Sequence, residues 1–176
     1  PALISALLMV ASGSASPDFN SGNSPLMQHS ESASARAAFL AKPALPPLFD
    51  DIERRTFDFF WQTANPANGL VPDRYPTPAP ASIAAVGFGL TAYPIGVERG
   101  YISRAQARER TLATVRFFRD APQGPAATGM SGHKGFFYHF LDMKTGARAG
   151  RTELSTVDTT LLLGGMLFAQ RYFDGT

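Results

Sequence analysis

The sequence contains no cysteine, which excludes disulfide bonds, thiolate zinc sites, a cysteine nucleophile and a lipid attached to cysteine. Charge is also scarce, because only 17% of the residues are charged and the formal net charge is +2. So small an excess forms no basic patch, and the composition offers no electrostatic basis for nucleic-acid binding. The chain has only three histidines, so a histidine-rich metal site is not expected. We predict no cofactor.

The apolar stretch at residues 2–11 is too short to span a bilayer, which needs about 20 apolar residues. Small residues follow at 12–16, as in the apolar and cleavage regions of a secretory signal peptide. The alternative is an ordinary buried helix. We predict a signal peptide at residues 1–16 that lacks its positively charged start. The mature protein is then expected to be periplasmic or secreted, without stable membrane insertion.

Residues 17–46 are rich in serine and proline and show little apolar pattern, which predicts a disordered linker. The folded part is expected at residues 47–176. A length of 176 residues allows one domain, or part of a larger one, at about 150 residues per domain. The hydrophobic content of 44% is enough for a buried core.

Four segments show helical spacing of apolar residues: 48–63, 82–97, 103–120 and 155–173. The second and fourth are apolar on nearly all sides, and such helices must be buried all round. Pro94 is expected to kink or end the second. The pattern therefore predicts a mainly α fold in which an inner ring of helices is covered by an outer ring.

A segment of different texture, rich in glycine and aromatic residues, lies at residues 124–150. Residues 142–146 have the composition of a turn. Before it, two sets of residues alternate: Phe136, Tyr138, Phe140 and Asp142 with Phe137, His139 and Leu141. We therefore predict a β-hairpin over about residues 135–151 inside this long loop.

The loops between the predicted helices combine carboxylates, aromatic rings and basic side chains. Aromatic faces stack on pyranose rings, while arginine and carboxylate groups form hydrogen bonds with sugar hydroxyls. The predicted substrate-binding residues are Asp73, Arg74, His133, Lys134, Tyr138 and Arg151. The expected partner is an oligosaccharide or polysaccharide.

Glu153 and Asp158 are the best local candidates for the two carboxyl groups that glycoside hydrolysis usually needs. Five residues along one helix give a net rotation of about 140°. The two side chains therefore converge only if Glu153 lies in the loop before the helix. Asp158 also has a structural interpretation, because Ser155-x-x-Asp158 is a capping-box pattern.

Other candidates have structural interpretations as well. Asp73 and Arg74 are adjacent and could form a substrate clamp or a plain ion pair. His133 could be a flexible site residue or merely exposed. His139 lies among aromatic residues, a setting more typical of a structural histidine held by hydrogen bonds.

Seven segments in unbroken order resemble the bacterial glucoamylase-like (glycoamylase) family. They are residues 55–61, 69–74, 82–88, 91–100, 121–125, 134–142 and 153–159. The resemblance implies an (α/α) six-hairpin toroid, of which this chain would be the N-terminal part. It also implies similarity to β-1,2-glucanases, which act on β-1,2-glucan or sophoro-oligosaccharides with inversion.

The family's acidic signature falls on Glu153 and Asp158, so the resemblance implies that both are catalytic. A full domain of this kind is more than twice as long, so at least one catalytic carboxylate is expected outside this chain, and the fragment alone is expected to be incomplete. One alternative is a non-catalytic glycan-binding protein on the same scaffold. Another is a polysaccharide lyase or unsaturated-uronyl hydrolase, which the mixed charges of the candidate residues disfavour.

Overall fold

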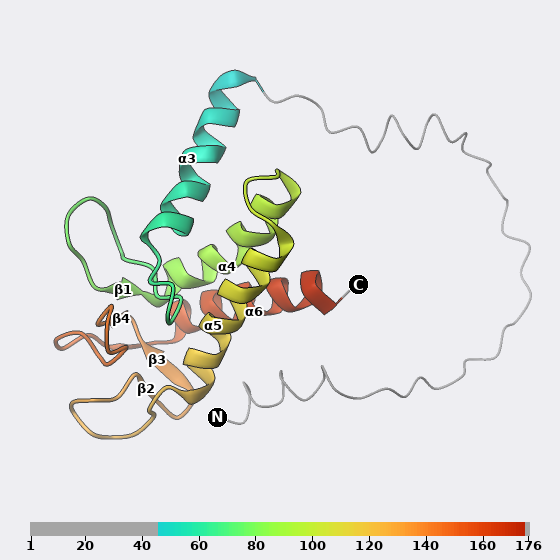
Figure 1. Cartoon of the computed structure of the whole chain (residues 1–176). Helices are drawn as coiled ribbons and strands as arrows, with labels where there is room; N and C mark the ends of the chain where they lie inside the picture. The colour runs from blue at the N-terminus through green and yellow to red at the C-terminus, as the bar shows by residue number, and fades with distance from the viewer. Residues whose placement is uncertain (1–45, 175–176) are drawn as a thin grey trace, which may run out of the picture.

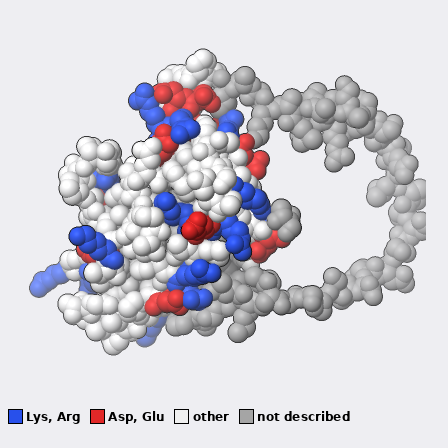
Figure 2. All heavy atoms as spheres, viewed as in Figure 1, with Lys and Arg blue, Asp and Glu red and all other residues white. Residues whose placement is uncertain are grey.

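The computed structural model describes residues 46–174 (Figure 1). The predicted signal peptide at 1–16 and the predicted linker up to residue 45 lie outside the described residues. Across 46–174, no helix combines the length and the apolar character needed to cross a bilayer. On the face shown in Figure 2, acidic and basic side chains are interspersed.

The described residues are mainly helical, as predicted. The helices are α3 (Pro47–Thr63), α4 (Ile83–Glu98), α5 (Arg104–Asp120) and α6 (Thr156–Asp174). Each predicted boundary lies within a residue or so of the observed one, and the capping box at Ser103 and Gln106 is present. Pro94 does not end α4, which continues to Glu98. Because Pro94 and Gly96 are buried in the core, packing outweighs the missing backbone hydrogen bond.

Helices α4 and α6 pack along each other, and α3 and α5 lie against α4 (Figure 1). The two central helices approach closely at Gly87 and Gly165, where a methyl group on Gly165 would overlap the Gly87 carbonyl. The prediction that both helices are buried all round is wrong for the described residues. Phe88 on α4 and Phe168 on α6 are exposed, because the described elements cover only part of each helix.

Short strands connect the loops to the helices. Strand β1 (Ala81–Ser82) pairs antiparallel with β4 (Phe140–Leu141). A second antiparallel sheet has the order β2 (Gly132–His133), β3 (Phe136–Tyr138) and β5 (Leu154–Ser155).

The predicted turn at residues 142–146 is present, and Asp142 Oδ1 accepts hydrogen bonds from the backbone of Lys144 and Thr145. The predicted hairpin is present around this turn, where Leu141 forms an antiparallel bridge with Arg148 and the backbone N–H of Ala149 donates to the carbonyl of Phe140. It does not extend over the whole of 135–151, because β3 pairs with β2 and β5 instead. The tight hairpin joins β2 to β3 through Lys134 and Gly135, with φ angles of 51° and 89°. Two positive φ angles mark the mirror-image turn that usually selects Asn-Gly, so Lys-Gly carried no clear signal.

Aromatic packing fixes β3 on the helices. The rings of Phe137 on β3 and Phe118 on α5 meet edge to face, with their centroids 5.0 Å apart. Both side chains are almost fully buried. The strand that leads to His139 is thus attached to the helical core.

Candidate active site

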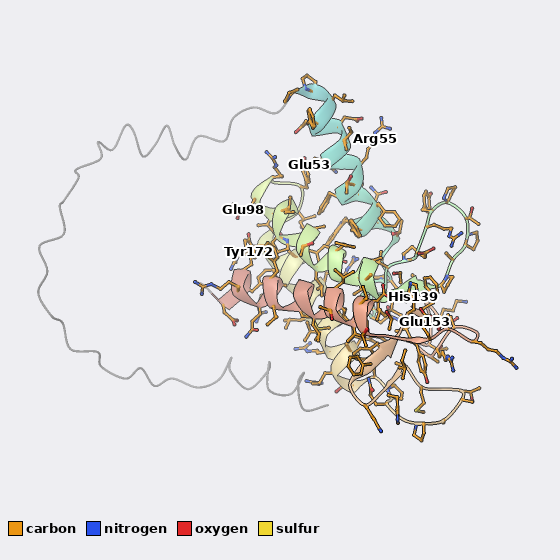
Figure 3. All side chains as sticks on the ribbon, turned by 180° about the vertical axis from the view of Figure 1, so that it is seen from behind. Glu53, Arg55, Glu98, His139, Glu153 and Tyr172 are labelled. Atoms are coloured by element: carbon orange, nitrogen blue, oxygen red, sulfur yellow. The ribbon has the colours of Figure 1, made fainter. Side chains whose placement is uncertain are left out.

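Two carboxylates and one imidazole meet where α4 and α6 begin. His139 lies between β3 and β4, Glu153 directly precedes β5, and Asp158 is in the first turn of α6. His139 Nδ1 is 2.9 Å from Glu153 Oε1, and His139 Nε2 is 3.8 Å from Asp158 Oδ1. Figure 3 shows His139 and Glu153 side by side near the start of α6. We call Glu153, His139 and Asp158 the His139 cluster.

The backbone of His139 is held on both sides. Its N–H donates to the carbonyl of Glu153 at 3.0 Å, and its carbonyl accepts from the N–H of Ile83 at 3.2 Å. Ile83 is the first residue of α4, so this bond satisfies a donor that the helix itself leaves unpaired. The imidazole also stacks on Phe140, with the ring centroids 3.8 Å apart.

Ser155 caps α6 and contacts the carboxylate of Asp158. The N–H of Asp158 donates to Ser155 Oγ at 3.1 Å, and the Ser155 hydroxyl donates to Asp158 Oδ2 in a short hydrogen bond. The part of the predicted capping box in which Ser155 caps α6 is therefore confirmed, and the Asp158 carboxylate contacts the Ser155 hydroxyl. Its catalytic role remains a prediction, because the same carboxylate also faces His139 through Oδ1.

Thr159 connects α6 to β3 beneath the cluster. Its hydroxyl accepts from the N–H of Phe137 at 3.0 Å and donates to the carbonyl of Ser155 at 2.6 Å. Thr159 is only 2% exposed, so these bonds form in the interior. They fix the start of α6 relative to the strand that leads to His139.

Glu153 lies in the loop before α6, which is the condition under which the two carboxylates converge. Hydrogen bonds hold its pKa below the ordinary value, first from its own backbone N–H and then from the His139 side chain. Arg148 adds a smaller attraction. Glu153 is therefore ionised at neutral pH and acts as a hydrogen-bond acceptor. Asp158 lies in the first turn of α6, where acidic residues are common because they interact favourably with the helix dipole.

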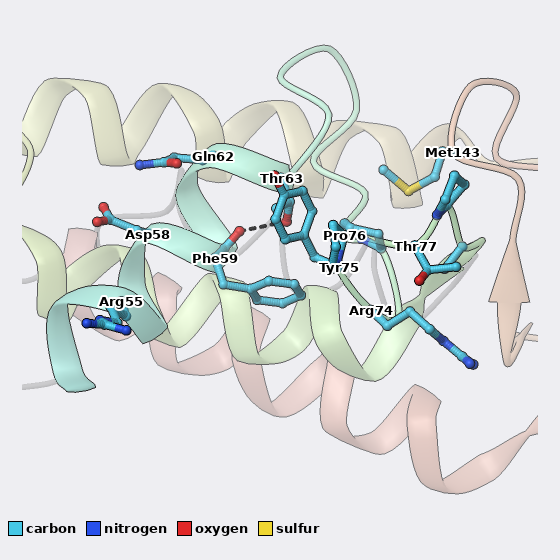
Figure 4. A pocket seen from close by; sticks show the side chains of 13 residues that line it. Arg55, Asp58, Phe59, Gln62, Thr63, Arg74, Tyr75, Pro76, Thr77 and Met143 are labelled. Atoms are coloured by element: carbon cyan, nitrogen blue, oxygen red, sulfur yellow. Dashed lines mark hydrogen bonds between the residues drawn. The ribbon is translucent and has the colours of Figure 1, made fainter. Parts of the chain in front are cut away.

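Asp73 and Arg74 form an ion pair with 2.7 Å between Oδ2 and Nη2, so the ion-pair interpretation is confirmed. Arg74 also lines a cleft of about 990 Å³ between α3 and residues 72–79 (Figure 4). Phe59 and Tyr75 give this cleft aromatic walls, and Gln62 adds an amide. The residues of the His139 cluster do not line it.

The other predicted substrate-binding residues lie on the strands and turns around the cluster. Tyr138 is buried, and the Arg148 guanidinium covers its ring at 4.3 Å, which places it in the core. His133 and Lys134 lie at the β2–β3 turn, and His133 pairs with Phe136. Phe136 is three residues from His139, or about 10 Å along a strand. Arg151 is exposed in the turn before β5.

Sequence reasoning favoured a structural role for His139, held by hydrogen bonds, because it lies among aromatic residues. The structure shows the hydrogen bond and also places His139 between the two predicted catalytic carboxylates. The available signal was its place inside the family-like segment 134–142, close in sequence to an acidic loop. Pairing of β3 with β5 brings these two stretches together. Among residues 46–174, no group of three or more metal-ligating side chains is arranged to hold a metal ion.

Known proteins resemble this chain in sequence and in fold. No protein-family model matches the chain. Over 133 residues, 72% of the chain, the sequence is 30% identical to an exo β-1,2-glucooligosaccharide sophorohydrolase (non-reducing end) of Parabacteroides distasonis, of which the match covers 17%.

Two solved structures extend this similarity to the fold. A glucoamylase-like protein of Bacteroides uniformis matches with a TM-score of 0.62 and 31% identity, over 75% of this chain and 32% of that protein. An endo-β-1,2-glucanase of Chitinophaga pinensis, solved with sophorotriose and glucose, matches with a TM-score of 0.61 and 28% identity. The match covers 75% of this chain and 33% of that structure. The chain thus spans about a third of these structures and under a fifth of the sophorohydrolase.

Proposed function

We propose that this chain, a relative of the bacterial glucoamylase-like proteins and β-1,2-glucanases, supplies part of the active site of a glycoside hydrolase that cleaves a β-glucan. The resemblance expected from the seven sequence segments is confirmed by similarity in both sequence and fold. The observation that carries the proposal is the His139 cluster. It brings together, at the start of two central helices, the two carboxylates that the resemblance marks as catalytic.

The substrate we propose is β-1,2-glucan or its sophoro-oligosaccharides. Support comes from the relatives, one of which is a sophorohydrolase of β-1,2-glucooligosaccharides and another a β-1,2-glucanase in complex with sophorotriose. The exposed carboxylate of Glu153 could accept hydrogen bonds from sugar hydroxyls at such a site. The predicted signal peptide further suggests that the protein acts in the periplasm or outside the cell.

We propose hydrolysis with inversion, in which a protonated acid faces the glycosidic oxygen and a carboxylate activates water across the sugar ring. The acid needs a raised pKa. Glu153 has the opposite property, because its hydrogen bonds lower its pKa. We therefore assign Glu153 to an acceptor role, either as the base toward water or as a partner of a sugar hydroxyl.

The test uses the natural protein that contains this chain, with Glu153→Gln and Asp158→Asn beside it, on linear β-1,2-glucan. Release of reducing ends should fall at least about 100-fold in a variant that removes a general acid–base group. Glu109→Gln is the matched control, because Glu109 is exposed on α5, outside the cluster. Its activity should equal that of the wild type.

A wild-type protein that is inert on β-1,2-, β-1,3- and α-1,4-glucans but binds one of them would contradict the proposal. The non-catalytic glycan-binding alternative would then hold. Equal losses in Glu109→Gln and the two cluster variants would instead show that activity follows general surface charge rather than the cluster.

A further inference from the structure

We infer that His139 is a positioning residue of this site, whose imidazole orients the Glu153 carboxylate and sets its place beside Asp158. The inference rests on the proposed function. It assigns to His139 a role that neither the residue pattern nor the relatives' names supply.

The first step concerns the proton on the ring. The lowered pKa of Glu153 means that its carboxylate is ionised and can only accept hydrogen bonds. At 2.9 Å from Glu153 Oε1, His139 Nδ1 must therefore carry the proton and donate it. The geometry thus selects the nitrogen that faces Glu153 as a donor.

The second step concerns the opposite edge of the ring. Asp158 Oδ2 accepts from the Ser155 hydroxyl, which leaves Oδ1 as the oxygen that faces His139 Nε2. Their separation of 3.8 Å is too long for a direct hydrogen bond, so this edge is the weaker contact. His139 therefore lies between the carboxylates and holds Glu153 more firmly than Asp158.

The third step concerns what holds the ring. Stacking on Phe140 restricts its tilt, and the backbone of His139 is bonded to Glu153 and to Ile83 at the start of α4. These contacts fix the position of the His139 side chain relative to the start of α4, although His139 itself lies between two strands. Such support of a reacting group by its neighbours is what functional sites require.

The hydrogen bond from His139 to Glu153 is expected to contribute little to stability. The Glu153 side chain is 66% exposed, and polar contacts between exposed side chains are weak. If orientation is what His139 contributes, its loss should lower kcat while leaving the thermal stability and KM nearly unchanged.

Three substitutions in the natural protein separate the two edges of the ring. Asn places an amide nitrogen close to the position of Nδ1, and Gln places one close to Nε2, whereas Phe keeps the stacking and has no donor. On linear β-1,2-glucan, we expect His139→Phe to lower kcat about 10- to 100-fold with KM changed less than about threefold, since a small misplacement of a reacting group can cost this much. His139→Asn should stay within about threefold of wild type, and His139→Gln should resemble His139→Phe.

The double variant Glu153→Gln/His139→Phe tests whether His139 affects catalysis through Glu153. If His139 acts through Glu153, the double variant should be no slower than Glu153→Gln alone. Losses that multiply, full activity of His139→Phe, or equal losses in His139→Asn and His139→Phe would each overturn the inference. If His139→Phe does not fold, the comparison of Asn with Gln decides, and a better Gln variant overturns the inference.

Failure of the proposed function would look different. In that case the wild type itself releases no reducing ends from any of the glucans, and the role of His139 falls with it. An active wild type with an unaffected His139→Phe variant overturns only the inference.

Discussion

The α4–α6 crossing and the loop segment 121–155 hold their geometry by different means. At the crossing, two backbones touch through Gly87 and Gly165, and buried apolar side chains such as Leu162 and Met166 surround the contact. The loop segment has strands of two or three residues, and side-chain hydroxyls and carboxylates complete its hydrogen bonding.

The difference separates two kinds of sensitivity. The close approach of the two helices requires that Gly87 and Gly165 have no side chains. An added methyl group should therefore lower stability more than the loss of any single contact at the crossing. The loop depends on individual hydrogen bonds, so replacing one hydroxyl should lower the free energy of unfolding moderately and disturb only the structure nearby. The crossing places the helix starts, and the loop places the chemical groups over them.

The largest expected effect comes from Gly165→Ala. Its new methyl group would overlap the Gly87 carbonyl, a backbone atom that cannot move aside without separating the helices. We expect a loss of about 3 kcal/mol in the free energy of unfolding, at the upper end for overpacked cores. Chemical denaturation of the natural protein measures it.

Gly164→Ala is the matched control, since a Cβ at Gly164 would have no atom of another segment within 4 Å. This variant should be neutral or more stable by up to about 1 kcal/mol, because alanine favours helices. Similar losses in both variants would show that helix α6, rather than the crossing, resists substitution.

The next effect comes from Thr159→Val, which removes a buried hydroxyl from the link between α6 and β3. The N–H of Phe137 then loses its acceptor in the interior, which should cost about 1–3 kcal/mol. Thr159→Ser retains the hydroxyl and should lose only about 0.8 kcal/mol for its methyl group. A serine variant less stable than the valine variant would mean that packing, not hydrogen bonding, holds this joint.

Ser155→Ala should have a smaller effect on stability, about 1 kcal/mol, as expected for an N-cap residue. It also removes the hydrogen bond to Asp158 Oδ2. Thr at the same position keeps the hydroxyl, so Ser155→Thr should retain most of the stability and activity. Thermal unfolding of the two variants checks this, and an unaffected Ser155→Ala protein would contradict the role of the cap.

The smallest effect concerns Asp142 and pH. Hydrogen bonds from the N–H and hydroxyl of Thr145 hold the pKa of Asp142 below its ordinary value. A lowered pKa in the folded state contributes stability above the unfolded value, near pH 4, and loses it as the pH falls through the folded value. Because the side chain is exposed, the contribution should be only a few tenths of a kcal/mol, about that of a surface pair.

Asp142→Asn removes this titration. Wild type should exceed it in stability at about pH 6, and the gap should narrow toward about pH 3 as the carboxyl of the wild type is protonated. Urea denaturation midpoints at several pH values follow the difference. A gap that is constant with pH would show that the turn does not depend on the charge.

Local patterns were enough to predict the helices, the capping box at Ser103, the cap of α6 and the turn at 142–146. Each depends on residues a few positions apart, whose spacing is visible in the chain. The convergence of Glu153 and Asp158, which both face His139, was predictable only as a condition, because helix geometry requires Glu153 to lie in the loop before α6. The ion pair of Asp73 and Arg74 followed from their adjacency.

Other features depend on contacts between distant segments. The division of the predicted hairpin follows from the pairing of β4 with β1 and of β3 with β5, which no local pattern reveals. The same pairing buries Tyr138 under Arg148 and places His139 against Glu153. Pro94 stays within α4 because the packing around it outweighs its effect on the backbone.

The sequence by itself thus determined the helical elements of this protein, the ends of those helices and the acidic residues near the start of α6. These follow from apolar periodicity and capping, which act over one or two helical turns. Only the tertiary structure decided which side chains meet, because strand pairing and the α4–α6 crossing join segments beyond the reach of local patterns, and even His139 and Glu153 are 14 residues apart. His139 belongs to that second group, since its position between two carboxylates exists only once β3, β5 and the starts of α4 and α6 come together.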